Sequence, residues 1–586
     1  MTDTNFTILD GELISYSGSE NKVIIPDGIK IIKEGAFLGC VNIEEITLPE
    51  GVTTIRHKAF WGCIGLKHIS LPKTLRTIEF CAFRECESLE EIEIPEGVNY
   101  MGDSVLHGCE MLKKAYLPDS LTSLGTSTFS DCFHLKEVRL PRYLENLSPS
   151  CFQGCINLNM IEIPDSVKTL EKGVFLGCSS LTCVKLHNGL KNIDRQCFEG
   201  CRKLIDLDVP DTVEFIGANA FYKSGLMLSC DSDFLVLGRI LIKYIGKDET
   251  AIIPDNVQFI GDHAFAYCEN LRTVIFPDTV TEIRDYAFER CRSLQNVTLP
   301  EGLKRLGTGV FTDCSSLHGV EFPPRLDHIG ARLFYGSGFE KYNNKDMTIL
   351  AGKYLISYRG SADKLSIPEG TEVIADEAFV QCGGVKEVSL PYGLRTIGDS
   401  AFRWRSELKK VSIPSTVNYI GENAFVNCHE PEITIMNPKG HLGENGFPDG
   451  AELRMVIGSH VLKIRLTWEV KAGDCPERRL WNFVCVRSAA TFAVLQKPEY
   501  KLSCALCFYN DGKWYRDYIS KNIVEAVCFT ALREDNSALE SVLSFGHLTH
   551  EQLRTCISFA IEHKLTQQQL ILMRYRHDVF GDNTTE

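Results

Sequence analysis

Two cysteines and two histidines near the end of the chain have the spacing of metal ligands. Cys504-x-x-Cys507 and His547-x-x-His550 could together supply the four ligands of a structural zinc site. The two cysteines also fit one apolar face of a helix, and the two histidines flank a predicted helix start. A lone Cys-x-x-Cys pair is a weak signal, so we expect no metal, no redox site and no bound cofactor.

No other residues have the spacing of a catalytic site. The sequence contains no Gly-rich phosphate loop, no Gly-x-Ser-x-Gly elbow and no His-Glu-x-x-His motif. His134, His187 and His318 lie in separate repeats and form no local triad. We therefore expect a protein that is not an enzyme. An enzyme with its site in the C-terminal region is the alternative that stays open.

A phenylalanine recurs every 23 residues and organises most of the chain. The first array spans residues 37–221, with Leu106 in place of one phenylalanine, and further arrays span residues 265–334 and 379–425. A fixed period of this size is typical of a solenoid, in which each turn packs only on its neighbours.

Each repeat has the pattern of one short strand followed by a turn. Ile46 and Leu48, nine and eleven residues after Phe37, alternate with polar residues, as in a strand with one buried face. Pro49 removes a backbone donor and so ends the strand. After the proline, Val52 and Ile55 are again expected to point inward. Stacked repeats would bury these residues and align their strands in a parallel sheet, with neighbours roughly 4.8 Å apart.

Thirteen of the 24 cysteines stand three residues after the anchor position of their repeat. They could form disulfides between adjacent turns or a ladder of buried thiols. Because the same position is used in every turn, and free cysteine is among the most buried residue types, we expect reduced, buried thiols. These residues are Cys40, Cys63, Cys86, Cys109, Cys132, Cys155, Cys178, Cys201, Cys268, Cys291, Cys314, Cys382 and Cys428.

These features resemble the BspA-like class of leucine-rich repeats. The motif Ala-Phe-x-x-Cys-x-x-Leu-x-x-Ile-x-Leu-Pro carries the resemblance, which covers about three quarters of the chain. The pattern is seen in full at Ala264-Phe265, Cys268, Leu271, Val274, Phe276 and Pro277. The family implies a curved solenoid that binds other macromolecules, and it does not imply an enzyme.

The predicted fold class is a β-rich leucine-rich-repeat solenoid with a parallel strand sheet and short turns or helices, followed by a small, mostly α-helical C-terminal domain. We expect the solenoid at residues 1–436, a linker and β cap at 437–475, and helical hairpins at 476–586. Ser or Thr followed three residues later by Glu or Gln marks helix starts at Ser537, Thr549 and Thr566.

Each array opens with two short apolar runs around a glycine-containing turn, which is typical of a β-hairpin. The hairpins are expected near residues 5–18, 233–246 and 346–360. The proline spacing across the breaks is close to two periods, so we expect the solenoid to continue through them.

The negative charge lies in the repeats. Residues 451–586 hold 17 Lys and Arg against 16 Asp and Glu, so the preceding 450 residues hold 45 against 61, within a net charge of −15. An acidic solenoid is a poor match for a phosphate backbone, so we do not expect nucleic acid as a partner.

The sequence carries no segment that resembles a signal peptide and no run of 18 apolar residues. We therefore expect no membrane span and a cytoplasmic location, which fits a chain rich in reduced cysteines. Secretion by a non-standard route is the alternative.

The most promising binding surface is the outward face of the predicted strands, eight and ten residues after each anchor. Solenoids present such faces as extended binding surfaces, although this one could also be a solvated face. We expect the partner-binding residues to be Glu91, Glu93, Lys114, Tyr116, Glu137, Arg139, Met160, Glu162 and Lys185.

These observations favour a non-catalytic scaffold that binds another protein, whose identity the sequence does not give. A surface or secreted adhesin or effector is the first alternative. The sequence also leaves open the oligomeric state, and whether the C-terminal helices bind a second partner or only cap the solenoid.

Overall fold

The computed structural model of the protein describes residues 5–345, 348–443, 445–448, 451–457, 460–466, 498–507, 515, 518–519, 521–532, 536–544 and 548–580. The predicted cap beyond residue 466, the predicted C-terminal domain up to residue 497 and His547 lie outside these residues. The chain forms two compact units. Unit 1 is residues 1–303, 309–323 and 336–339, and unit 2 is residues 304–308, 324–335 and 340–586.

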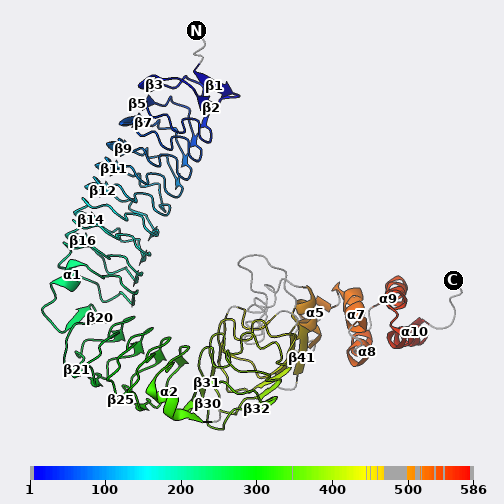
Figure 1. Cartoon of the computed structure of the whole chain (residues 1–586). Helices are drawn as coiled ribbons and strands as arrows, with labels where there is room; N and C mark the ends of the chain where they lie inside the picture. Colours follow the sequence, from blue (N-terminus) through cyan, green and yellow to red (C-terminus); the bar gives the residue numbers. More distant parts are fainter. Residues whose placement is uncertain are drawn as a thin grey trace. The chain divides into compact units, whose positions relative to one another are not determined.

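Within each unit, the repeats stack as the turns of a solenoid, with short strands side by side (Figure 1). In the three-residue strands of the first set one inward residue lies between two outward residues, and the longer strands β36, β38 and β40 continue the same alternation, which confirms the predicted pattern. In unit 1 these strands are β3 (Lys22–Ile24), β5 (Glu45–Thr47), β7 (His68–Ser70), β9 (Glu91–Glu93), β11 (Lys114–Tyr116), β12 (Glu137–Arg139), β14 (Met160–Glu162), β16 (Cys183–Lys185), β21 (Thr250–Ile252), β23 (Thr273–Ile275), β25 (Asn296–Thr298) and β27 (Gly319–Glu321). In unit 2 they are β32 (Lys364–Ser366), β34 (Glu387–Ser389), β36 (Lys410–Ile413), β38 (Glu432–Met436) and β40 (Glu452–Ile457).

A second set of two-residue strands follows the proline turn of most repeats, and sequence reasoning had not predicted it as a ladder. Val98 N–H donates to the carbonyl of Pro95 (3.0 Å) and closes one such turn. In unit 1 the strands are β4 (Ile31–Ile32), β6 (Thr54–Ile55), β8 (Thr77–Ile78), β10 (Tyr100–Met101), β13 (Asn146–Leu147), β15 (Thr169–Leu170), β17 (Asn192–Ile193), β18 (Phe215–Ile216), β22 (Phe259–Ile260) and β24 (Glu282–Ile283). In unit 2 they are β26 (Arg305–Leu306), β28 (His328–Ile329), β33 (Val373–Ile374), β35 (Thr396–Ile397), β37 (Tyr419–Ile420) and β39 (His441–Leu442).

The anchor side chains form a buried aromatic column inside the turns. Phe129, Phe152 and Phe175 are fully buried, and neighbouring rings stack with their centroids 5.3 and 5.6 Å apart. Such pairs add to the stabilisation that comes from burial alone. Because Phe152 contacts one ring above and one below, this part of the column holds consecutive turns in register.

The ladder cysteines are free thiols, and eleven of the thirteen are buried. Most of them donate a hydrogen bond from Sγ to the carbonyl of the anchor residue 26 positions earlier, as Cys178 does to Phe152 (3.1 Å). Burial raises the pKa of Cys109 to about 12. The cysteines therefore serve as small buried donors that satisfy a backbone carbonyl.

All three predicted hairpins are present. They are β1 (Phe6–Leu9) with β2 (Glu12–Tyr16), β19 (Phe234–Leu237) with β20 (Ile240–Tyr244), and β30 (Thr348–Ala351) with β31 (Tyr354–Tyr358). The second strand of each hairpin pairs in parallel with the next short strand of the second ladder. The strand β29 (Asn344–Lys345) pairs with β30.

The hairpin tyrosines take the anchor position of a turn. Tyr16 stacks near Phe37 and Tyr244 near Phe265, each with ring centroids 5.2 Å apart. Each hairpin therefore replaces one ordinary turn, as the proline spacing indicates. The short helices α1 (Gly225–Leu228) and α2 (Gly338–Asn343) precede the second and third hairpins.

The repeat pattern continues past Phe425, where the sequence indicated that it ends. Phe447 is fully buried and its ring stacks on Phe425 with centroids 5.9 Å apart. The strands β38 and β39 pair with β36 and β37 of the preceding turn. The missed turn has 22 residues and contains two prolines outside the repeat pattern, which concealed it. After it, β40 and β41 (His460–Arg465) form an antiparallel hairpin.

The C-terminal region is helical, as expected. Within the described residues, its helices are α5 (Pro498–Cys507), α7 (Ile523–Leu532), α8 (Asn536–Ser544), α9 (His550–Glu562) and α10 (Thr566–Phe580). Thr549 and Gln552 form the predicted capping box of α9. Ser537 and Thr566 lie inside the first turns of α8 and α10 instead of preceding them. Leu462 of β41 and Cys504 of α5 belong to one continuous buried core.

Candidate functional site

The nine residues predicted to bind a partner lie on the outward face of five strands, β9, β11, β12, β14 and β16. We call the outward residues of the first set of strands the strand face. Its most exposed apolar residue in this region is Met160, which is 55% exposed, and Tyr116 is 42% exposed. The inward neighbours Ile92, Ala115 and Ile161 are buried. The alternation of the strand thus separates residues that stabilise the solenoid from residues that could contact a partner.

Opposite charges meet across adjacent rungs of the strand face. Lys114 Nζ lies 3.7 Å from a carboxylate oxygen of Glu137, and Lys185 Nζ lies 3.3 Å from one of Glu162. Arg139 pairs with Asp119 at 3.0 Å. All of these side chains are largely solvent-exposed except Asp119, so each pair is worth at most about 1 kcal/mol. A partner could therefore replace these ion pairs with its own charged side chains at a small cost in free energy.

A groove of about 850 Å³ crosses the strand face between β12 and β14. Glu137, Arg139, Met160 and Glu162 line it, together with Arg142. Four of the nine predicted residues are therefore brought together by this groove. Glu91, Glu93, Lys114, Tyr116 and Lys185 lie outside its lining, on the strands to either side.

The groove coincides with an interruption of the strand ladder. The strands β9, β11 and β12 form one sheet and β14 and β16 another, and within the described residues no backbone pairing joins β12 to β14. In regular turns, Lys136 N–H donates to Lys113 O (3.0 Å) and Thr182 N–H to Asn159 O (2.9 Å). Among the described residues, the corresponding bond from Asn159 N–H to Lys136 O is absent. Backbone donors and acceptors thus line the groove without partners from the ladder.

The interruption is local, since the same two turns remain joined elsewhere. Asn146 of β13 pairs with Thr169 of β15 in the second ladder, and the rings of Phe129 and Phe152 stack in the core. A similar gap between β23 and β25 holds a smaller groove of about 450 Å³, lined by Thr273, Ile275 and Asn296. The residue types of the strands do not differ visibly at these gaps, so sequence reasoning had no signal for them.

The Cys504 and Cys507 thiols are free, and Cys504 is fully buried in α5. Burial raises the pKa of Cys504, which disfavours the thiolate that a metal requires. Within the described part of the chain, no group of three or more His, Cys, Asp or Glu side chains is placed to hold a metal ion. His550 is the first residue of α9, and its ring meets that of Phe580 edge-on.

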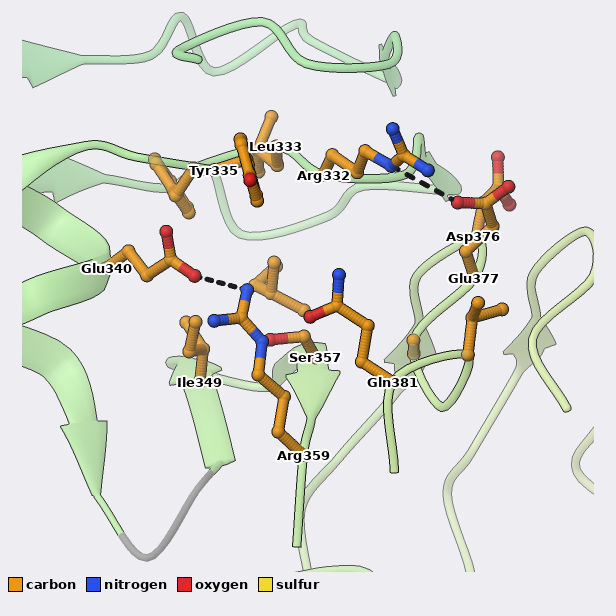
Figure 2. A pocket seen from close by; sticks show the side chains of 14 residues that line it. Arg332, Leu333, Tyr335, Glu340, Ile349, Ser357, Arg359, Asp376, Glu377 and Gln381 are labelled. Atoms are coloured by element: carbon orange, nitrogen blue, oxygen red, sulfur yellow. Dashed lines mark ion pairs between the residues drawn. The ribbon is translucent and has the colours of Figure 1, made fainter. Parts of the chain in front are cut away.

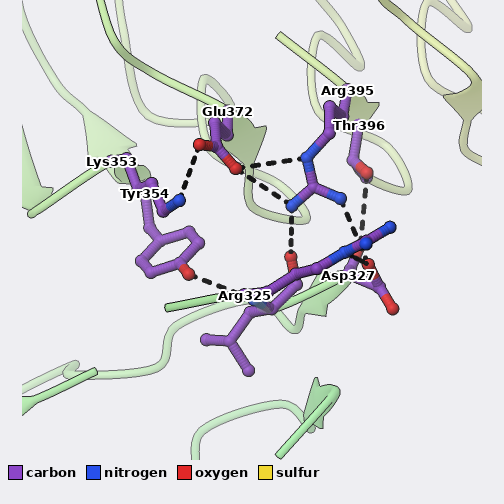
Figure 3. A network of polar contacts seen from close by, with 8 residues as sticks. Arg325, Asp327, Lys353, Tyr354, Glu372, Arg395 and Thr396 are labelled. Atoms are coloured by element: carbon purple, nitrogen blue, oxygen red, sulfur yellow. Dashed lines mark hydrogen bonds and ion pairs between the residues drawn. The ribbon is translucent and has the colours of Figure 1, made fainter. Parts of the chain in front are cut away.

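Arginines connect the arrays across their breaks, and sequence reasoning missed them. In unit 2, Arg395 donates to the carbonyl of Leu326 (3.1 Å) and pairs with Asp327 (3.3 Å) and Glu372 (3.1 Å) (Figure 3). Tyr354 of the hairpin accepts a hydrogen bond from Leu326 N–H. Arg395 therefore ties the turn after the hairpin to the turn before it.

The first break, in unit 1, is closed in a similar way. Arg284 donates to the carbonyl of Glu214, and its guanidinium lies over the rings of Phe215 and Phe259, 5.0 and 5.2 Å from their centroids. Arg239 of the hairpin donates to Gln258 (2.8 Å). These contacts hold the solenoid together through the break.

The stacked turns, the two parallel ladders and the exposed strand face define a leucine-rich-repeat solenoid. The chain matches the family described as BspA type leucine rich repeat region over residues 12–136, 108–227, 244–359 and 352–454. It therefore belongs to this family, and the resemblance drawn from the repeat motif is confirmed.

Several solved bacterial structures are similar to this chain. A leucine-rich repeat protein from Bacteroides ovatus is 22% identical, with 78% of this chain and 97% of that chain covered and a TM-score of 0.34. A leucine rich cell surface protein from Faecalibacterium prausnitzii is 21% identical, with 74% and 93% covered and a TM-score of 0.29. The T. pallidum leucine rich repeat protein is 29% identical over 35% of this chain and 91% of that chain, with a TM-score of 0.27.

No curated protein matches the chain. Among the helices in the described ranges, none combines the length and the apolar character that a transmembrane helix requires.

Proposed function

We propose that this protein is a non-catalytic scaffold that binds another protein through its strand face, with the groove between β12 and β14 as the centre of contact. One observation supports the proposal most strongly. The groove contains exposed Met160, and it lies where the backbone N–H and C=O groups of β12 and β14 do not pair with each other. An extended segment of a partner can satisfy such backbone groups, as in strand addition, while side chains in the groove select its sequence.

The charges of the groove suit a partner segment of mixed charge. Arg139 and Arg142 lie on one side and Glu162 and Asp165 on the other, so a segment with acidic and basic residues in the matching order would find complementary partners. Met160 between them supplies an apolar contact, and methionine adapts to differently shaped side chains.

Site-specific crosslinking tests the proposal. A photo-crosslinking residue at Met160 should capture a partner protein that the same residue at Ile24 does not capture. Ile24 is an exposed apolar residue of the strand face on β3, 76% exposed and remote from the groove in sequence. With the captured partner purified, Met160→Arg should weaken binding at least tenfold and Ile24→Arg should leave it unchanged. Equal capture at both positions would refute the groove as the contact centre.

We also propose a reducing, cytoplasmic location, which the free thiols of the ladder support. Disulfides in protein isolated under native redox conditions would contradict it and favour the adhesin or effector alternative. An enzymatic site in the C-terminal region is not part of the proposal.

A further inference from the structure

The two internal breaks build the same pocket twice, once in each unit. Each pocket lies between the last turn of one array, the hairpin that follows and the first turn of the next array. The anchors Phe221 and Phe334 correspond, as do the hairpin tyrosines Tyr244 and Tyr358, so the residues of the two pockets can be compared position by position.

In unit 2 the pocket is largely filled, with a free volume of about 50 Å³, and the chain's own Arg332 and Arg359 line it. The guanidinium of Arg359 pairs with Glu340, and that of Arg332 lies 3.5 Å from a carboxylate oxygen of Glu377 (Figure 2). Asp376 beside them pairs with His328 at 3.2 Å. In this pocket the basic side chains of the protein itself are therefore bound by carboxylates that lie where the hairpin interrupts the repeats.

In unit 1 the residues that fill the pocket have been replaced. Asn219 stands at the position of Arg332, Met227 at that of Glu340 and Ile245 at that of Arg359. The pocket is open to about 450 Å³, within the size range of ligand sites in proteins. Met227 and the nearby Leu235 line it as apolar walls.

One acidic residue of the unit 2 pocket, Asp376, has an acidic counterpart in the open pocket, whereas Glu340 and Glu377 correspond to Met227 and His263. Asp262 corresponds to Asp376, and Phe215 stands where its partner His328 would be. Within the described residues, no Lys, Arg or His side-chain nitrogen lies within 4.0 Å of an Asp262 carboxylate oxygen, whereas Glu289 is engaged by His263 at 3.3 Å. Burial and the neighbouring Asp285 raise the pKa of Asp262 to about 6, despite the opposing effect of Arg284.

The two basic side chains near Asp262, those of Lys243 and Arg284, form their hydrogen bonds with backbone carbonyls. Lys243 Nζ donates to the carbonyls of His263 (2.9 Å) and Ala266 (3.3 Å), and Arg284 is held by the carbonyl of Glu214. The open pocket thus keeps a half-buried carboxylate that no ion pair neutralises.

We propose that the open pocket of unit 1, lined by Asp262, Tyr222, Met227 and Leu235, binds an arginine side chain of a partner protein. The guanidinium would pair with Asp262, whose counterpart Asp376 pairs with the basic side chain of His328 in unit 2. The aliphatic part of the arginine side chain would lie against Met227 and Leu235. This site is separate from the strand face and does not depend on the function proposed for it.

Titration of the full-length protein with small probes tests the assignment. N-acetyl-arginine amide should bind with a Kd below about 1 mM, and the uncharged citrulline analogue should bind at least tenfold more weakly. Asp262→Asn should weaken binding of the arginine probe at least tenfold. The double substitution Met227→Glu with Ile245→Arg would restore the internal ion pair of unit 2 and should abolish binding.

Two controls separate this site from the strand face. Glu145→Gln removes an exposed carboxylate of another turn and should leave binding of the probe unchanged, and so should Met160→Arg in the groove. Thermal unfolding of each variant checks that it is folded. If the double variant does not fold, Asp262→Asn alone tests the proposal. Equal binding of the citrulline probe, no effect of Asp262→Asn, or preferential binding of acetate through Lys243 would each overturn the proposal.

Discussion

The aromatic column should dominate the local stability of the solenoid, and Phe152 offers the clearest test. Its side chain is 0% exposed and is stacked between Phe129 and Phe175. Truncation to alanine removes a buried ring and leaves a cavity, which costs about 3–5 kcal/mol in well-packed cores. Because a turn packs only on its neighbours, the loss should be concentrated between residues 129 and 198.

Hydrogen exchange measures this loss turn by turn, which a single melting curve of a long repeat array does not. The amides of Phe129, Phe152 and Phe175 each donate to the next turn, at 2.8 to 2.9 Å. A loss of about 3 kcal/mol corresponds to roughly hundredfold faster exchange where exchange occurs by opening of these turns. The amide of Phe37, which donates to Ala59 at 2.7 Å, should be unaffected.

Lys185→Ala is the matched control on the outward side of the same region. Lys185 is exposed and, among the residues that the structure describes, pairs only with exposed Glu162, so its loss should change stability by no more than about 0.5 kcal/mol. Equal acceleration of exchange by Phe152→Ala and Lys185→Ala would refute the assignment of inward and outward positions. Acceleration spread evenly to Phe37 would refute the nearest-neighbour account.

Three further predictions follow from named contacts. In thiol titration at pH 8, exposed Cys183 should react at once, while the eleven buried ladder cysteines should react only after unfolding; prompt reaction of the ladder would contradict their burial. Arg395→Ala should destabilise the second break by about 1.5–3 kcal/mol, seen as faster exchange of the Leu326 amide, whereas Lys386→Ala at an exposed pair should not. The folded-state pKa of Asp262 is raised to about 6, so its ionisation destabilises the fold as pH rises from about 4 to 6; Asp262→Asn should therefore gain stability over the wild type across this range in urea melts, and a pH-independent difference would contradict the shift.

Much of the solenoid could be predicted from the repeat, because each position has the same surroundings in every turn. The 23-residue period alone predicts that Phe152 and the inward residue Ile161 are buried, and both are buried in the structure. The hairpins could be found from their aligned apolar runs. Only the structure shows that the ring of Tyr244, in the second hairpin, stacks like an anchor phenylalanine.

The candidate sites were less predictable, because they depend on departures from the repeat. Met160 and Arg139 could be placed on the outward face, but the groove between them comes from a small separation of two strands whose residue types are ordinary. The missed turn around Phe447 has an irregular length, so a search for a fixed period did not find it.

By itself, the sequence determined which residues of each turn point inward, the column that they form and the family to which the chain belongs. These depend on contacts between adjacent turns, and a period in the sequence records such contacts directly. Only the tertiary structure decided where the ladder is interrupted and which charges meet at the breaks. Arg395 reaches a carbonyl 69 residues earlier, and Asp262 lacks the ion pair that its counterpart Asp376 makes with His328. Such contacts arise from the exact stacking of turns around an inserted hairpin, and no local pattern of residues encodes that geometry.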